Sequence, residues 1–383
     1  MTIELIRQAT RQKTGDCKSG IPQDALLCNM DLPLRGTFYP LGYAVEIVTN
    51  DPDVLEAAHE SFGHRRLRRG NRTLQVRIGI GEGGGPECPP EPTRREYNHL
   101  YSLLADTDNH AVLDLKTCTS FVWLSRAAAK NRLYFRHNFL EKVVYLLLGS
   151  SVVTDLHAAC VSKNGRGILL CGNSGAGKST LAYACARTGW TYTSDDTSYL
   201  INDSQPPRVI GHSHRLRFRP TAKALFPELA DREITPRMEG KASIEVPVSE
   251  LPRLTTTANE VGVHAVVYLS RRRSTPGKLV KLPKGTATVR TRKELYSAGE
   301  IRANHERILE VLSDIPTYEL QYSEFDQGIR QLELLAQDIR GIRKVPPPFT
   351  SRVRRSRLIP SGNCPAASDG GKPDATTAIS IVK

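Results

Sequence analysis

The stretch GNSGAGKST, residues 172–180, determines the fold prediction for this chain. Residues 172–179 fit the phosphate-binding pattern G-x-x-x-x-G-K-[S/T] without departure. The apolar run GILLC (167–171) before it is typical of a buried parallel strand, and the Leu/Ala-rich run 180–187 after it is typical of a helix. A strand, a glycine-rich loop and a helix in this order predict a nucleotide-binding loop and disfavour a chance glycine-rich turn.

The chemistry of this loop follows from its backbone. Glycines allow the chain to curl, so that loop N–H groups and the start of the helix surround phosphate oxygens with partial positive charge. Lys178 is expected to reach the β- and γ-phosphates, and the Ser179 hydroxyl is expected to ligate Mg²⁺. The residues expected to contact the nucleotide are Gly172, Asn173, Ser174, Gly175, Ala176, Gly177, Lys178, Ser179 and Thr180.

The composition indicates a globular protein that is not exported. The chain has 383 residues, which favours two domains. No run of the sequence approaches the roughly 18 apolar residues of a membrane helix, and segment 1–20 lacks the apolar core of a signal peptide. The eight cysteines are scattered without a C-x-x-C pair, so they predict neither a zinc site nor a disulfide framework. We therefore expect a cytoplasmic protein with reduced thiols and no membrane partner.

The net charge of +13 raises the alternative of nucleic-acid binding. Segment 341–383 holds eight Lys or Arg and two Asp or Glu, so 8 − 2 = +6 of this charge is concentrated there. An acidic protein or an anionic metabolite fits such a charge equally well. We therefore expect a nucleotide partner and do not expect a nucleic-acid partner.

The pattern of the chain divides it into four regions and predicts an α/β fold. Residues 1–30 are expected to be a loosely ordered arm, and 31–125 a small α/β domain. Apolar and alternating patterns predict its strands at 43–48, 74–80, 111–115 and 120–124. Residues 126–340 are expected to form the nucleotide-binding domain, with a helix at 137–148 packed on it and further strands at 263–270 and 316–322. The Pro-, Ser- and Arg-containing segment 341–383 is expected to be disordered, because it has little apolar surface to bury.

Two adjacent aspartates follow the loop closely, in ARTGWTYTSDD (186–196). Gly189 is expected to end the loop's helix, and 190–193 to form a strand. The helix would lead the chain roughly 14 Å away from the loop, and the strand would lead it back by roughly 16 Å. Asp195 and Asp196 would then reach the level of the phosphates, at the carboxyl end of a parallel neighbour strand. One carboxylate could hold the metal, and the other could accept a proton from an attacking hydroxyl. The alternative is a solvated Asp-Asp turn or a helix cap.

His157 lies fifteen residues before Gly172. Residues 156–161 and 167–171 are expected to form a hairpin closed by KNGRG (163–167). His157 would then lie near the far end of the first strand of the hairpin. The sequence leaves open whether that end approaches the phosphates, and a structural role for this histidine is the alternative.

Together, His157, the loop 172–179, Gly189 and the pair Asp195-Asp196 resemble the C-terminal kinase domain of bifunctional HPr kinase/phosphorylase. The resemblance covers about 40 residues, 157–196, in residue type and in spacing. It implies a P-loop fold of the phosphoenolpyruvate carboxykinase type behind a small α/β domain.

The same resemblance implies the activity and the roles of the site residues. It implies transfer from ATP to a serine of a phosphocarrier-like protein, and a homo-oligomer. Lys178 would stabilise the β/γ-phosphates, and Ser179 and Asp196 would hold Mg²⁺. Asp195 would be the base on the acceptor hydroxyl, assisted by His157.

The chain departs from this family in three places. The E-x-R-G-x-G-I-type loop and the later G-R-N element are missing, and Thr180 stands where the family usually carries Glu. Kinase activity is therefore expected and phosphorolysis is not. RMEGKASIEVPVSEL (237–251) is the nearest analogue of the missing loop, and it supplies three candidate polar contacts: Glu239, Lys241 and Glu245.

A basic strand lies at HRLRFR (214–219), with Arg215, Arg217 and Arg219 on one face. Such a face could bind phosphate or carboxylate groups, but an edge strand protected by charge is the favoured interpretation.

Four functions are compatible with these features. A protein serine kinase is favoured over a kinase of a small hydroxylated metabolite, although acceptor recognition lies outside the motif. The remaining two are a nucleotide-binding regulator without transfer and a nucleic-acid-binding protein.

Overall fold

The computed structural model describes residues 30–64, 69–82, 85–236, 242–272, 276–297, 299–338 and 350–352. The expected arm lies outside these ranges except for residue 30, and the expected tail lies outside them except for Thr350–Arg352 (β21), which pairs with β17 (Thr256–Ala258). No helix in the described part of the chain is both long and apolar enough to span a membrane.

The first sheet has the strand order β1-β2-β3-β7-β6-β5-β4, and β3 runs parallel to both of its neighbours. The expected strands at 43–48, 74–80, 111–115 and 120–124 are confirmed within it. The bounds are β1 Leu34–Phe38, β2 Tyr43–Thr49, β3 Arg69–Gly81, β4 Thr93–Tyr97, β5 Leu100–Asp106, β6 Asn109–Asp114 and β7 Thr119–Ser125. Helix α1 (Pro52–Phe62) follows β2, and the Asp51 side chain caps it by accepting from the Asp53 N–H.

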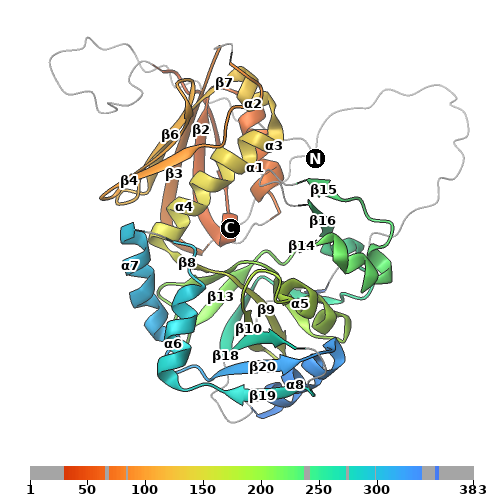
Figure 1. Cartoon of the computed structure of the whole chain (residues 1–383). Coiled ribbons are helices and arrows are strands. Elements are labelled where there is room, and N and C mark those ends of the chain that lie inside the picture. The colour runs from red at the N-terminus through yellow and green to blue at the C-terminus, as the bar shows by residue number, and fades with distance from the viewer. Residues whose placement is uncertain are drawn as a thin grey trace, which may run out of the picture. The chain divides into compact units, whose positions relative to one another are not determined.

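A helical segment covers this sheet. It consists of α2 (Arg126–Lys130), α3 (Arg132–Phe135), a π-helical turn η2 (Arg136–Glu141) and α4 (Lys142–Ser151). Its apolar residues, among them Phe139 and Leu147, share a core with Val76 and Ile78 of β3. Figure 1 shows α4 lying along the first sheet. The segment 137–148 therefore packs on the first sheet, while Tyr145 also stacks on Tyr199 of the second sheet, so the expectation that it packs on the nucleotide-binding domain is met only in part.

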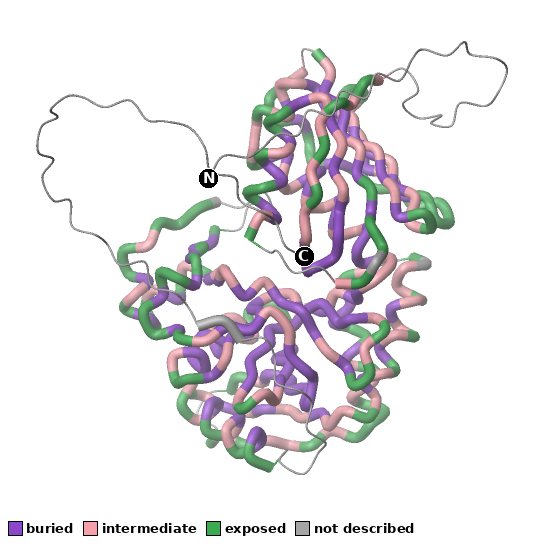
Figure 2. Tube along the Cα trace, turned by 180° about the vertical axis from the view of Figure 1, so that it is seen from behind, coloured by how far each residue is buried: buried purple, intermediate pink, exposed green. Residues whose placement is uncertain are grey.

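The second sheet has the order β21-β17-β11-β9-β10-β18-β13-β12-β8, and β20 and β19 continue from β18. Its central strands are buried, as the purple trace in Figure 2 shows. The expected strands at 263–270 and in 316–322 are confirmed. The bounds are β8 Val153–Leu156, β9 Ala158–Lys163, β10 Arg166–Cys171, β11 Thr191–Ser194, β12 Ser198–Ile201, β13 Arg208–Gly211, β18 Glu260–Arg271, β19 Lys278–Lys281 and β20 Thr317–Tyr322.

Helices cover both faces of the second sheet. Helices α5 (Lys178–Arg187) and α8 (Phe325–Asp338) share one core cluster, which contains Leu181 and Leu332. On the other face, Leu309 and Leu312 pack with Val266 in a separate cluster, close to α6 (Lys284–Lys293) and α7 (Gly299–Ile308). A small sheet of β14 (Arg215–Phe218), β16 (Ala242–Pro247) and β15 (Thr235–Pro236) lies beside α5. The described chain is thus a mixed α/β structure with several sheets.

The hairpin of β9 and β10 changes the expected neighbour of the loop strand. β9 lies between β10 and β11 and runs antiparallel to both, so β11 is not the neighbour of β10. The short turn at Asn164 and Gly165, both with positive φ, lets β9 pair with β10 before β11 can do so. β10 and β11 still run in the same direction and end at the same edge of the sheet. Asp195 and Asp196 therefore lie at the edge that carries the loop, as expected, although the strand order differs from the expected one.

The close approach of β13 to the end of β11 can be tested with glycine substitutions. A β-carbon at Gly211 would lie 2.2 Å from the Thr193 carbonyl oxygen and 2.7 Å from Ser194 Cβ. We expect Gly211→Ala to lower the free energy of unfolding by about 1–3 kcal/mol through overpacking. Gly149→Ala in α4 is the matched control, because a β-carbon there meets no atom within 4 Å outside its own helix. It should be neutral or stabilise by about 0.5–1 kcal/mol. Urea denaturation measures both, and an unchanged midpoint for Gly211→Ala would contradict the packing described here.

Candidate functional site

The glycine-rich loop joins β10 to α5, as expected for the motif. Gly172, Gly175 and Gly177 have φ of 140°, 89° and 96°, which favour glycine, and Gly177 immediately precedes α5. A β-carbon at Gly172 would lie 3.2 Å from Ala176 Cβ, so the curl leaves little room for a side chain there. The Asn173 carbonyl accepts from the Ala176 N–H at 3.0 Å and closes the turn.

Lys178 is held at the inner side of the loop. Its ammonium donates to the Gly172 carbonyl at 2.8 Å, and only 6% of the residue is exposed. Burial lowers the pKa of Lys178, while the nearby carboxylates of Asp196 and Glu294 act in the opposite direction. The ammonium therefore lies in an acidic surrounding at the start of the helix.

Asp195 lies directly after β11, beside the loop helix. Its backbone carbonyl accepts from the Ser179 hydroxyl at 3.2 Å, which ties the end of β11 to the first turn of α5. Its carboxylate accepts from the Arg217 N–H at 2.7 Å. Burial raises the pKa of Asp195 to about 6, and the Asp196 charge adds to this rise, whereas the Arg217 hydrogen bond and guanidinium oppose it.

The structure brings His157 to Asp196. Ala158 pairs with Cys171 across the hairpin, so His157 lies at the edge where the loop begins. Its Nε2 is 3.4 Å from Asp196 Oδ1, and its ring packs on Tyr296 with centroids 5.2 Å apart. The two aspartates thus have different surroundings: Asp196 is near Lys178 and His157, and Asp195 is turned to β14.

Glu294 is a site residue that the sequence did not indicate. It follows α6, its carboxylate accepts a hydrogen bond from the Gly172 N–H, and it is near Lys178 and His157. Burial raises the pKa of Glu294. Its backbone carbonyl accepts from the His157 N–H at 2.7 Å. No motif surrounds this residue, which is more than a hundred positions from the loop, so no sequence signal could have identified it.

The basic strand β14 contacts the site. The Arg219 guanidinium donates to Ser174 Oγ in the loop at 2.8 Å. Arg217 and Arg215 pair with Glu245, at 2.8 and 3.0 Å. β14 does lie at the edge of its small sheet, as the favoured interpretation required. In addition, Arg219 directly after it reaches the loop, and the Arg217 backbone reaches Asp195. Glu239 and Lys241 lie outside the described residues.

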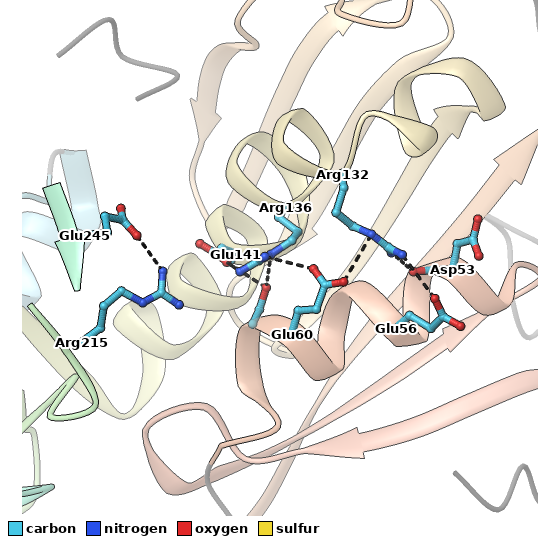
Figure 3. A network of polar contacts seen from close by, with 9 residues as sticks. Asp53, Glu56, Glu60, Arg132, Arg136, Glu141, Arg215 and Glu245 are labelled. Atoms are coloured by element: carbon cyan, nitrogen blue, oxygen red, sulfur yellow. Dashed lines mark hydrogen bonds and ion pairs between the residues drawn. The ribbon is translucent and has the colours of Figure 1, made fainter. Parts of the chain in front are cut away.

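A cavity of about 350 Å³ opens beside the two aspartates. One wall contains Asp195, Asp196 and Tyr199 with His212, His214, Arg215 and Arg217 around the start of β14, and another contains Glu91, Ser61 of α1 and His137, Glu141, Lys142 and Tyr145. Figure 3 shows the polar network behind that wall, in which Arg136 bonds Glu60 and Glu141 while Arg132 bonds Glu56 and Glu60. The cavity is therefore lined by charged groups on both sides.

No model of a known protein family matches this chain, and no curated protein matches it. Among solved structures, the chain is similar to the HPr(Ser) kinase/phosphatase from Coxiella burnetii, with 12% sequence identity and a TM-score of 0.30. The match covers 49% of this chain and 90% of that chain. A similarity of this size is too weak to support a conclusion about fold or function.

The burial of Asp195 predicts that its charge opposes folding. Since the pKa of this carboxyl is raised from 3.8 to about 6, the folded state binds the proton more tightly than the unfolded state. The penalty is therefore complete above pH 6 and fades as the pH falls through that value. We expect Asp195→Asn to raise the free energy of unfolding at about pH 8 by at most about 3 kcal/mol, and by roughly half of that at about pH 5.

Chemical denaturation in the presence of a chelator and without nucleotide measures this effect. Asp108→Asn is the matched control, because Asp108 is exposed in a turn of the first sheet. A loss of stability for Asp195→Asn at both pH values would contradict the burial of an ionised carboxylate at this position.

Proposed function

We propose that this protein is an ATP-dependent kinase of the HPr serine kinase type, which transfers the γ-phosphate to a serine hydroxyl. The observation that carries the proposal is the convergence at one sheet edge of a buried lysine in a glycine-rich loop and an aspartate pair that opens onto a cavity. Phosphoryl transfer requires groups that hold the nucleotide phosphates and a space for the acceptor, both next to the same carboxylates.

The residues present fit a nucleotide with Mg²⁺. The loop glycines leave a cradle that a β-carbon would fill, and the carboxylate of Asp196 and the Ser179 hydroxyl offer the oxygen ligands that Mg²⁺ prefers. Bound MgATP supplies the phosphoryl group. Lys178 would then neutralise charge on the β/γ-phosphates, and Arg219, beside Ser174, would reach the same loop.

Asp195 is the proposed base. A buried carboxylate with a pKa of about 6 is mostly ionised at neutral pH, yet it binds a proton more readily than an exposed aspartate does. The Arg217 N–H holds one of its oxygens in place, so the carboxylate is oriented before the acceptor binds. His157 would position Asp196 from the other side.

Two acceptor classes are proposed, and a specific observation favours the second. The family resemblance favours a serine of a phosphocarrier-like protein. The cavity of about 350 Å³ favours a small hydroxylated metabolite, because its size falls within the range of small-molecule sites. Its lining carries charged groups of both signs, Lys142, Arg215 and Arg217 beside Glu91, Glu141, Asp195 and Asp196, which offer both hydrogen-bond donors and acceptors to a polar metabolite. Phosphorolysis is not proposed, because the segments tied to it are missing. A homo-oligomer is proposed from the resemblance alone, and a cytoplasmic location from the scattered cysteines, which are typical of reduced thiols.

Transfer is tested by incubating the purified protein with γ-labelled ATP and Mg²⁺, together with candidate phosphocarrier proteins or a panel of hydroxylated metabolites. Label in a protein band supports the first acceptor class, and a phosphorylated metabolite detected by mass spectrometry supports the second. Tight ATP binding without transfer or hydrolysis would instead support a nucleotide-binding regulator and contradict the kinase proposal.

Substitutions at the site are expected to separate binding from chemistry. Lys178→Ala should weaken both ATP binding and transfer. Asp195→Asn should leave ATP affinity nearly unchanged and lower the transfer rate by about 10²–10⁴-fold, since Asp195 acts on the hydroxyl proton. Asp108→Asn should behave as the wild type. If Asp195→Asn keeps the full rate, the base is a different residue.

A further inference from the structure

The turn between β13 and β14 carries two histidines that the proposed phosphotransfer does not use. His212 and His214 flank Ser213, whose hydroxyl is turned inward and donates to Asn259 Oδ1 at 2.5 Å. The His214 carbonyl accepts from the Val248 N–H at 2.9 Å. The backbone that carries both imidazoles is therefore anchored on either side.

A third histidine, His64, lies next to these two and belongs to the part of the chain that forms the first sheet. His64 follows α1, and its ring lies against that of His214 with centroids 3.7 Å apart and an angle of 34° between the ring planes. His212 meets His214 edge-on at 5.9 Å. One ligand nitrogen from each of the three histidines lies within 4.8 Å of the other two. Three nitrogen donors thus converge on one point from two different parts of the chain.

We propose that His64, His212 and His214 form a binding site for a divalent transition metal, of which Zn²⁺ fits best. Imidazole nitrogen suits Zn²⁺ and its neighbours in the first transition row, whereas Mg²⁺ prefers oxygen, so this site is distinct from that of the nucleotide metal. Zn–N bonds of about 2.0–2.1 Å in tetrahedral geometry place ligand atoms about 3.4 Å apart. The nitrogens must therefore approach by at most about 1.4 Å, and the exposed His64 can rotate to do so.

The surroundings of the cluster determine what the metal can do. The His212 ring is held edge-on by Tyr145 and Tyr199, both at 5.5 Å, which limits its rotation. His212 and His214 line the cavity next to the aspartates. Three histidines leave the fourth zinc position to water or to an oxygen of a ligand in that cavity, as in zinc sites that keep an open position. The ion would also tie the end of α1 to the β13–β14 turn.

Metal binding is tested directly, without nucleotide, so that its outcome is independent of the kinase proposal. Untagged full-length protein is stripped with a chelator and dialysed against Zn²⁺, and bound metal is measured by elemental analysis. We expect one Zn²⁺ per chain from this site, and an affinity at least about tenfold weaker in His64→Ala, His212→Ala and His214→Ala. Zn²⁺ should also raise the Tm of the wild type and not that of His64→Ala.

His99→Ala is the matched control, because His99 is exposed in a turn of the first sheet away from the cluster. It should bind Zn²⁺ as tightly as the wild type. His64→Gln, which keeps side-chain bulk but removes the imidazole, should reproduce the loss seen in His64→Ala. Thermal unfolding of the metal-free variants checks that they are folded. The absence of bound Zn²⁺ in the wild type, or equal affinity in His64→Gln and His99→Ala, would overturn the proposal.

Discussion

The register of β9 against its two neighbours is the constraint on which the candidate site depends. Ala158 pairs with Cys171, and Cys160 pairs with Ser194, so the start of β9 meets the ends of β10 and β11 at one edge. All three strands are buried, and a slip of one residue would turn each side chain to the opposite face. Backbone pairing in a packed sheet is therefore sufficient to place His157, the loop and the two aspartates together, without a contribution from the side chains of the site.

The charges at this edge are coupled by burial. Lys178, Glu294 and Asp195 are each at least nine-tenths buried. Burial lowers the pKa of the lysine and raises the pKa of both carboxyl groups, so it favours the neutral form of each. Opposite charges nearby offset part of this cost, so removing one partner would leave another charge uncompensated. Such an arrangement is unfavourable for stability and favourable for chemistry, because oriented charges in a dry site act strongly on a reacting group.

The first sheet and its helices contribute residues to the candidate site. Its core cluster includes Tyr199, Ile201 and Ile210 of the second sheet, and Arg69 at the start of β3 pairs with Glu260 of β18. The helices that cover it supply one wall of the cavity, and the network in Figure 3 connects these helices. The acceptor side of the proposed reaction therefore depends on the segment that carries no recognisable motif.

The sequence by itself determined the local elements: the strand, loop and helix around 172–180, the hairpin before it, and the short return path that ends at Asp195. Glycine dihedrals, turn residues and hydrophobic periods act over a few residues, so they can be recognised without knowledge of the rest of the chain. The tertiary structure alone decided that β9 separates β10 from β11, that α4 covers the first sheet, and that Glu294, Arg219 and His64 reach their partners. These contacts join residues far apart in sequence, and they depend on which buried faces fit together, which local spacing does not encode.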